Sequence, residues 1–255
     1  MERFRPRLVL FTGALLVLAT LLAATTAART RPRSGAAFWV PAPPPPVVVA
    51  RFPFDGAGAA AWADASGNGH TLKPVTGNGA VAELVDHQAG SAVRFPDPCR
   101  RKAPCRRLVL RAVTTADLNP AARPFRYGAT MRLAPNRTSN GQNLMQKGYS
   151  TEGSQYKLQV DGRSGHPSCA LVSGATIHLV LARVTVADDR WHTIECRRHG
   201  ANLAIYVDGT VQGMVTVPID LSVVNEEPLS LGGKSAYGDN DQYHGLLDDV
   251  WVAVG

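Results

Sequence analysis

The sequence has little of what marks several classes of protein. Only 18% of its 255 residues are charged and 45% are hydrophobic, whereas disordered chains are more charged and less apolar. Its four cysteines are too few for a small fold held together by disulfides. We find no convincing helical periodicity, and only one apolar run approaches membrane-spanning length. The composition therefore predicts a globular chain without a helical framework.

The net charge of +7 is concentrated near the N-terminus. Residues 1–28 contribute +2, and three arginines between 29 and 46 contribute +3, so the remainder carries only +2. Because a nucleic-acid partner requires a strongly basic face, this balance excludes one. One local exception is Arg94–Arg111, with seven basic residues and one acidic residue. This run either contacts an anionic envelope polymer or glycan, or forms a solvated rim that salt would screen.

The N-terminal residues have the pattern of a secretory signal. Three arginines lie within Met1–Arg7, a 17-residue uncharged apolar run covers Leu8–Ala24, and small residues follow as far as Ala28. This pattern predicts a signal peptide over residues 1–28 and a secreted or cell-surface protein. The alternative is an uncleaved membrane anchor, with the positive flank on the cytoplasmic side.

Residues 29–46 predict a linker. They contain three arginines and then five prolines between Pro41 and Pro46. Prolines in sequence favour an extended polyproline conformation, which builds no core. The linker is either a spacer or an unstructured leader, and the folded domain is predicted over residues 47–255.

The rest of the chain predicts an all-β fold. Short runs of alternating apolar residues recur, each bounded by Gly, Asn, Asp or Pro, and twelve such strands fit one two-sheet antiparallel jelly-roll sandwich better than a βαβ fold. The predicted strands are Val47–Phe54, Ala80–Val85, Ser91–Phe95, Arg107–Ala112, Phe125–Leu133, Gln155–Val160, Ser168–Ser173, His178–Val186, Trp191–Arg198, Asn202–Val207, Val211–Val217 and Gly245–Val254.

Six short motifs occur in the order found in one family. They are Arg51-Phe-Pro-Phe-Asp55, Asp64-Ala-Ser-Gly-Asn-Gly69, Trp191-His192, Tyr206-Val-Asp-Gly209, Leu231-Gly-Gly233 and Gly245-Leu-Leu-Asp-Asp-Val250. With them the chain resembles laminin G-like, concanavalin A-like lectin/glucanase jelly rolls over nearly all of residues 47–255. Some motifs also have a local explanation, since Asp208-Gly209 suits a hairpin turn.

The four cysteines predict two disulfides, as expected for an exported protein. Cys99 and Cys105 enclose five residues, and Cys169 and Cys196 each lie on a predicted strand. Of the three possible pairings, 99–105 with 169–196 is the simplest. No Cys-x-x-Cys or neighbouring histidine pair indicates a zinc site.

The sequence contains no recognisable catalytic motif. The glucanases that share the fold carry Glu-x-Asp-x-x-Glu or a form one residue shorter, and this chain has neither. A glycosidase needs two facing carboxylates, and no nucleophile accompanies His192, which we interpret as a hydrogen-bonded strand residue. No Gly-x-Ser-x-Gly, His-Glu-x-x-His or phosphate loop is present. We therefore expect no enzyme and assign no catalytic residue; a divergent glycoside hydrolase is the alternative.

Calcium is the cofactor that the sequence suggests. It prefers carboxylate, amide and backbone oxygens held by turns, and Asp64 and Asn68 supply such oxygens. The family resemblance implies that an acidic residue near the last strand completes the site, and Asp248 is at that position. The alternative is that Asp64 and Asn68 only form an Asx turn.

Sugar ligands need aromatic faces and polar groups. The loop from Tyr237 to His244 offers both, with Tyr237, Asp239, Asn240, Asp241 and Tyr243 as candidates, and Trp62 is a further candidate. The alternative is a polar loop whose Tyr243 belongs to the core. The sequence thus predicts an exported, non-catalytic module that binds a carbohydrate or an extracellular or envelope protein; a structural envelope module without a small ligand is a further alternative.

Overall fold

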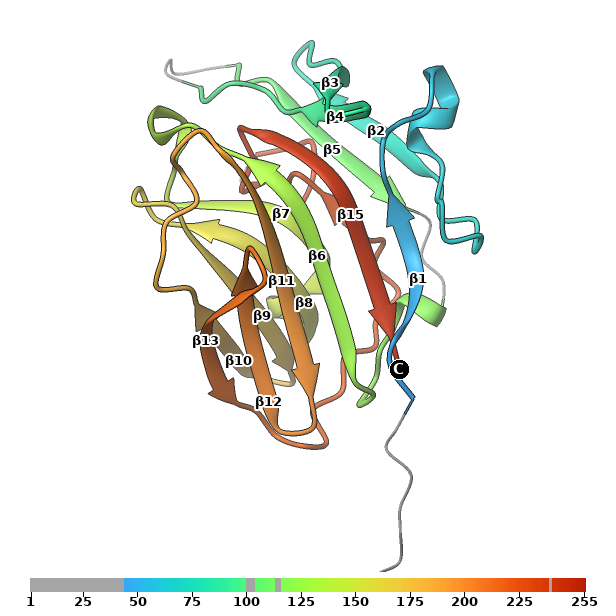
Figure 1. The fold of residues 1–255 in the computed structure, drawn as a ribbon, viewed down its shortest axis with the longest axis vertical. Coiled ribbons are helices and arrows are strands. Elements are labelled where there is room, and N and C mark those ends of the chain that lie inside the picture. The colour runs from blue at the N-terminus through green and yellow to red at the C-terminus, as the bar shows by residue number, and fades with distance from the viewer. Residues whose placement is uncertain (1–43, 100–103, 113–115, 239) are drawn as a thin grey trace, which may run out of the picture. The chain divides into compact units, whose positions relative to one another are not determined.

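The computed structural model describes residues 44–99, 104–112, 116–238 and 240–255. They form the predicted antiparallel sandwich of two sheets, and the only helices among them are four short 3-10 turns (Figure 1). The predicted signal peptide and nearly all of the linker lie outside the described residues, so both boundaries stay predictions. Within the described part of the chain, no helix is long and apolar enough to cross a membrane.

The first sheet has eight strands in the order β13-β12-β11-β6-β15-β4-β3, with β1 also paired to β15. It faces the viewer in Figure 1. Its strands are β1 (Val47–Phe52), β3 (Glu83–His87), β4 (Gly90–Arg94), β6 (Phe125–Arg132), β11 (Trp191–His199), β12 (Asn202–Val207), β13 (Thr210–Thr216) and β15 (Leu246–Val254).

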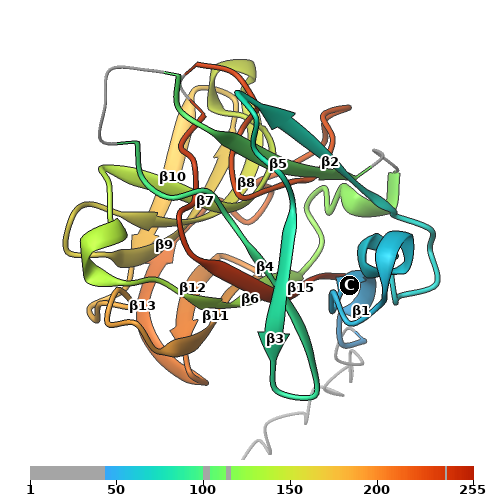
Figure 2. The ribbon, with the colours of Figure 1, turned by 90° about the horizontal axis from the view of Figure 1, so that it is seen from above.

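The second sheet has seven strands in the order β10-β9-β8-β7-β14-β5-β2. The two layers are separated in the view from above (Figure 2). Its strands are β2 (Leu72–Gly77), β5 (Arg107–Ala112), β7 (Gly141–Tyr149), β8 (Ser154–Asp161), β9 (His166–Ser173), β10 (Thr176–Leu181) and β14 (Ser230–Leu231). The 3-10 turns are η1 (Gly58–Trp62), η2 (Ala116–Leu118), η3 (Pro135–Arg137) and η4 (Ser150–Glu152).

The hydrophobic core lies between the two sheets. Its aromatic centre is Phe125, Tyr127 and Tyr156, whose ring centroids lie 5.2–5.6 Å apart. Phe125 and Tyr127 belong to the first sheet and Tyr156 to the second. All three are buried. Successive side chains of a strand point to opposite faces of the sheet, so every second residue of facing strands contributes to the core.

All twelve predicted strands have a counterpart in the structure, with ends that shift by up to five residues. The prediction missed three strands: β2, β7 and β14. Pro74 lies within β2, and proline inside a run argues against a strand. β14 has only two residues. β7 carries the polar residues Gln142, Asn143, Gln146 and Lys147, all buried, so it lacks the apolar alternation by which strands are found.

Candidate ligand-binding site

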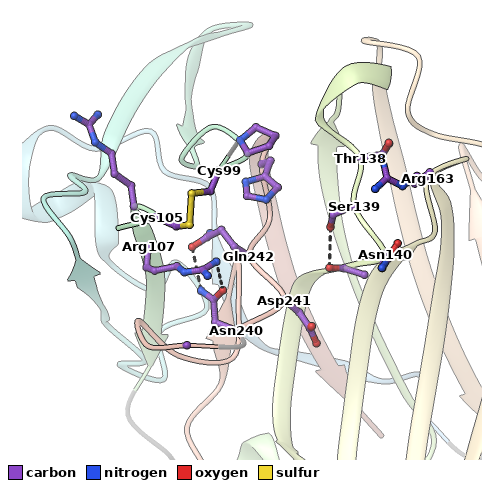
Figure 3. A pocket seen from close by; sticks show the side chains of 15 residues that line it. Cys99, Cys105, Arg107, Thr138, Ser139, Asn140, Arg163, Asn240, Asp241 and Gln242 are labelled. Atoms are coloured by element: carbon purple, nitrogen blue, oxygen red, sulfur yellow. Dashed lines mark hydrogen bonds between the residues drawn. A yellow bond between two sulfur atoms is a disulfide. The ribbon is translucent and has the colours of Figure 1, made fainter. Parts of the chain in front are cut away.

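A cleft of about 500 Å³ opens at one end of the sandwich (Figure 3). The start of β5 and the disulfide between Cys99 and Cys105 form one side, while Thr138–Gly141 and Arg163 form the other, and Asp241 lies between them. Its volume is within the usual range of about 300–1,000 Å³ for ligand pockets. The lining is polar: its described residues include three arginines, two asparagines and a glutamine, and no Phe, Tyr, Trp, Leu, Ile or Val.

Two buried amide side chains fix one wall of the cleft. Gln242 accepts a hydrogen bond from the backbone N–H of Leu108 and donates to the Leu108 carbonyl, which fastens its loop to β5. The Oε1 of Gln242 also accepts a bond from Nδ2 of Asn240, whose Oδ1 accepts a 2.7 Å bond from the guanidinium of Arg107. Because Asn240 and Gln242 are almost fully buried, they hold the Arg107 guanidinium in one place.

The charge of the cleft is positive. Arg106 and Arg163 are exposed, and neither makes an ion pair with another residue that the structure describes. Asp241 is the only acidic side chain in the described lining, and its Oδ2 lies 2.7 Å from Nζ of Lys234 and 3.9 Å from Nζ of Lys157. The cleft therefore presents arginines whose charge is not balanced by the acidic group beside them.

His244 adds no positive charge to the lining. It is almost buried, and its Nδ1 lies 2.7 Å from the carbonyl oxygen of Pro96. Burial, together with the guanidinium groups of Arg107 and Arg137, lowers the pKa of His244, while the Pro96 carbonyl and Asp97 oppose this. The imidazole is therefore neutral at neutral pH and serves as a polar wall.

Both disulfides are formed as the cysteine spacing favoured. Cys99–Cys105 closes the loop beside the cleft, and Cys169–Cys196 joins β9 to β11 inside the core. The described residues include no free cysteine. Two disulfides are typical of proteins that fold in an oxidising compartment.

Some residues of the predicted binding loop, Tyr237 to His244, line the cleft, and others belong to the hydrophobic core. Asn240 and Asp241 line the cleft. Tyr237 is 78% exposed and lines a neighbouring hollow, which shares Cys105, Arg107 and Gly238 with the cleft. Asp239 lies outside the described residues.

The assignment of Tyr243 to the ligand site is wrong. Its side chain is fully buried, packs edge-on against Phe95 and hydrogen-bonds the carbonyls of Arg132 and Leu246. A tyrosine in a core commonly satisfies its hydroxyl in this way. Tyr243 thus supports the loop from beneath and belongs to the core.

Trp62 does not join this group of side chains. It lies at the end of η1, packs edge-on against Phe54 with ring centroids 6.2 Å apart, and contacts the hydrophobic core. Trp62 is half-buried, so part of its surface is open to solvent. A ligand contact at Trp62 stays a prediction, separate from the cleft.

Asp64 forms an Asx turn. Its carboxylate accepts hydrogen bonds from the backbone N–H groups of Arg51, Ser66 and His70 and from the Ser66 hydroxyl. Burial raises the pKa of Asp64, but these bonds outweigh it and hold the pKa below its usual value. Nδ2 of Asn68 donates to the carbonyl of Val49, so this loop is fastened to β1.

Asp248 has different partners. Its Oδ2 lies 2.5 Å from Nδ1 of His87, its Oδ1 accepts the backbone N–H of Asp249, and the His87 ring stacks on Trp191 at 3.7 Å. Among the described residues, no group of three or more His, Cys, Asp and Glu is placed to hold a metal ion. The Asp64 and Asp248 carboxylates already face N–H and O–H donors, which does not fit a shared calcium cage. Calcium binding stays a prediction, with the Asx turn as the observed alternative.

His192 has the structural role that its sequence context indicated. Its two ring nitrogens lie 2.8 Å from Asp208 and 3.0 Å from Asp188, which ties two loops together. Burial lowers the pKa of His192, but the two carboxylates outweigh it and raise the pKa above its usual value.

Several cleft residues were missed by the sequence-based prediction. Arg106 and Arg107 lie in the basic run noted above, so charge density was a usable signal for them. The sequence around Arg163 and Thr138–Gly141 contains no such signal, because isolated polar residues in turns are common in every β protein. Only the fold brings them opposite the disulfide loop.

The chain belongs to the concanavalin A-like lectin/glucanases superfamily, since residues 114–253, more than half of the chain, match the laminin-G-type model of that superfamily. No curated protein matches the sequence. The family assignment agrees with the sandwich and with the motifs that suggested it.

Solved structures share the fold at low sequence identity. The binding domain of Paraclostridial Mosquitocidal Protein 1 has a TM-score of 0.59 and 13% identity, over 81% of this chain and 48% of that one. Domain 4 of AbnA, an extracellular arabinanase from Geobacillus stearothermophilus solved with arabinotriose, has a TM-score of 0.59 and 12% identity, over 82% and 93%. The binding domain of botulinum neurotoxin DC in complex with rat synaptotagmin II has a TM-score of 0.58 and 9% identity, over 81% and 48%. The chain thus spans about half the length of the two toxin domains.

Proposed function

We propose that residues 47–255 form an exported, non-catalytic module that binds a carbohydrate in the cleft at the end of the sandwich. The observation that carries this proposal is the wall in which Gln242 and Asn240 fix Arg107 opposite the polar segment Thr138–Gly141. Fixed hydrogen-bonding groups around a concave site are what a sugar requires. The arabinotriose complex of the arabinanase domain supports the choice of ligand class.

The cleft favours binding over hydrolysis. A glycosidase of the usual type places two carboxyl groups about 5–10 Å apart across the scissile bond. Of the described lining residues only Asp241 is acidic, and Lys234 holds it at 2.7 Å. The cleft itself also favours a binding module over a structural envelope module, for which we would expect a flat end.

The test is an array of neutral and acidic glycans and cell-wall polymers, read with and without a calcium chelator. Gly141→Trp is the blocking variant, because a Cβ at Gly141 meets no atom within 4 Å and its φ is not in the left-handed region. Thr176→Trp, at an exposed position on the edge strand β10, is the bulky control. We expect Gly141→Trp to abolish binding and Thr176→Trp to retain it; binding that survives Gly141→Trp would rule out this cleft.

A protein ligand is the second candidate, favoured by one observation. Edge strand β10 exposes the apolar side chains of Ile177, Leu179 and Leu181, which are 58%, 43% and 47% exposed. The botulinum neurotoxin domain, in its complex with synaptotagmin, contacts a protein. A protein ligand at β10 would be lost in Leu179→Ser and retained in Gly141→Trp, the reverse of the carbohydrate result.

A further inference from the structure

The arginines of the cleft go beyond what a neutral sugar needs. A neutral sugar is recognised through hydroxyl and amide groups and by stacking on aromatic rings. The described lining contains no Phe, Tyr or Trp, yet it contains Arg106, Arg107 and Arg163. In the close-up, Arg107 and Arg163 come from opposite walls (Figure 3).

These guanidinium groups are available to a ligand. Arg106 and Arg163 are exposed and have no ion pair within the described part of the chain. The Arg107 side chain donates a hydrogen bond to the neutral amide of Asn240. Two half-buried arginines near the cleft are paired: Arg137 with Asp97 at 2.8 Å and Arg132 with Asp189 at 2.9 Å. The cleft therefore brings together arginines that lack an acidic partner among the described residues.

The acidic group in the cleft does not cancel this charge. Asp241 is held at 2.7 Å by Lys234 and has Lys157 at 3.9 Å. Around these groups lie the side chains of Ser139 and Asn140, which offer hydroxyl and amide contacts. An acidic peptide would need an apolar pocket for its anchoring side chains, and the described lining offers no large aliphatic or aromatic side chain.

We propose that the cleft selects anionic saccharides, in which Arg106, Arg107 and Arg163 bind the carboxylate or sulfate groups and the amide and hydroxyl side chains bind the sugar. Guanidinium groups suit this task because their N–H donors match the oxygens of carboxylate and sulfate groups in bidentate pairs. Asn240 positions Arg107 in advance, which lowers the entropy lost on binding. This inference rests on the proposed function and names the ligand class of the same site.

The experiment compares charged polymers with matched uncharged ones by isothermal titration calorimetry on the purified chain. The pairs are polygalacturonate with its methyl ester, and chondroitin sulfate with its desulfated, carboxyl-reduced form. We expect at least one charged polymer to bind, its uncharged counterpart to bind at least tenfold more weakly, and the affinity to fall as NaCl is raised from 50 to 300 mM.

Variants then locate the binding in the cleft. We expect Arg106→Ala and Arg163→Ala each to weaken binding about tenfold, with unchanged thermal melting. Arg51→Ala is the matched control, since it removes the same charge from an exposed position on β1, where Arg51 forms an ion pair with Asp249; it should change the affinity less than twofold. An equal loss in Arg51→Ala would show non-specific attraction and overturn the inference.

The two proposals fail in different ways. Equal affinity for charged and uncharged polymers, with binding lost in Gly141→Trp, would overturn the selection of anions and leave carbohydrate binding intact. Failure of all four polymers, together with a panel of neutral arabinan and galactan, would overturn both.

Discussion

Cys169 on β9 and Cys196 on β11 form a disulfide that links the two sheets of the sandwich, with their Cα atoms 5.8 Å apart. Both side chains are fully buried. The bond connects the sheets near the edge formed by β10 and β13, while β1 and β15 lie toward the opposite side of the first sheet (Figure 1).

Removing this bond should destabilise the domain strongly. In the double variant Cys169→Ala/Cys196→Ala we expect a loss of roughly 3–4 kcal/mol in the free energy of unfolding, since the bond closes a loop of 27 residues in the unfolded chain. The Cys99–Cys105 bond closes a loop of only 6 residues, so Cys99→Ala/Cys105→Ala should lower the free energy of unfolding by about 2 kcal/mol. Urea denaturation measures both. A larger loss for the short loop would contradict the assignment of Cys169–Cys196 as the main covalent brace.

Gln242→Leu should destabilise the domain and weaken ligand binding together. The substitution leaves the buried N–H and carbonyl of Leu108 without their partner, at a cost of roughly 2–4 kcal/mol. It also releases Asn240 and with it Arg107. Gln159→Leu is the control, because Gln159 donates only to the side chain of Asp161. A loss as large in Gln159→Leu, measured by denaturation, would refute the role of Gln242.

Lys147 should make stability rise with pH above neutrality. It is fully buried, and its ammonium donates to Oδ1 of Asn119 and to the carbonyl and Oδ1 of Asn225. Burial lowers the pKa of Lys147 to about 8, against the opposing effect of Glu226 and Glu227. Since the unfolded chain keeps this proton up to about pH 10.4, it binds more protons than the folded chain between the two values. The contribution to stability therefore increases from about pH 8 upward, by a total of the order of 3 kcal/mol.

Urea denaturation at pH 7.5, 8.5 and 9.5 measures this slope. The range stays below pH 10, where the raised pKa values of the buried Tyr127, Tyr156 and Tyr243 begin to reduce stability. Lys147→Met lowers stability overall because it removes three hydrogen bonds to the Asn119 and Asn225 oxygens, but it should flatten the slope. An unchanged slope in Lys147→Met would assign the pH dependence to other groups.

Asp64→Ala should destabilise the loop that follows η1. It removes the acceptor for three backbone N–H groups, those of Arg51, Ser66 and His70, which costs roughly 1–3 kcal/mol. Because the pKa of Asp64 is lowered by folding, its contribution is present above about pH 4 and is lost as the pH falls through the folded-state value. Asp86→Ala, at an exposed position on β3, is the control and should have little effect in thermal melting.

The same variant separates the turn from the predicted calcium ion. A shared ion at Asp64 and Asp248 would raise the melting temperature with calcium concentration, as any ligand of the native state does, and both Asp64→Ala and Asp248→Ala would abolish the rise. A wild-type melting temperature that is the same in calcium and in chelator would leave the Asx turn as the whole function of Asp64.

The sequence predicted the strands whose apolar residues alternate, and it failed where a strand is held by polar groups. β12 (Asn202–Val207) was predicted with its observed bounds because Leu203, Ile205 and Val207 point to the core. β7 escaped prediction because it buries Gln142 and Lys147, whose side chains are satisfied by hydrogen bonds to distant residues: Gln142 accepts the backbone N–H of His244, and Lys147 donates to Asn119 and Asn225. A single sequence does not show which distant groups will satisfy a polar residue.

The cleft was predictable only on one side. The loop from Tyr237 to His244 and the basic residues Arg106 and Arg107 stand out by composition, whereas Arg163 lies opposite them only after β8 and β9 have paired. Tyr243 has the same residue type as Tyr237, yet one is in the core and the other is 78% exposed. The direction of a loop side chain depends on the tertiary structure, which local sequence does not specify.

The pairing of β1 with β15 determines how the domain bears mechanical load. His244, which lines the cleft, lies just before β15, and Val254 at the far end of β15 is opposite Val47, where β1 begins. A pull between a bound ligand and the start of β1 is therefore directed along the two antiparallel strands. Their hydrogen bonds are then strained together, in shear, and are not opened one after another as in peeling. The domain should therefore resist a higher unfolding force when the ligand is pulled against Val47 than when the force acts across the strands.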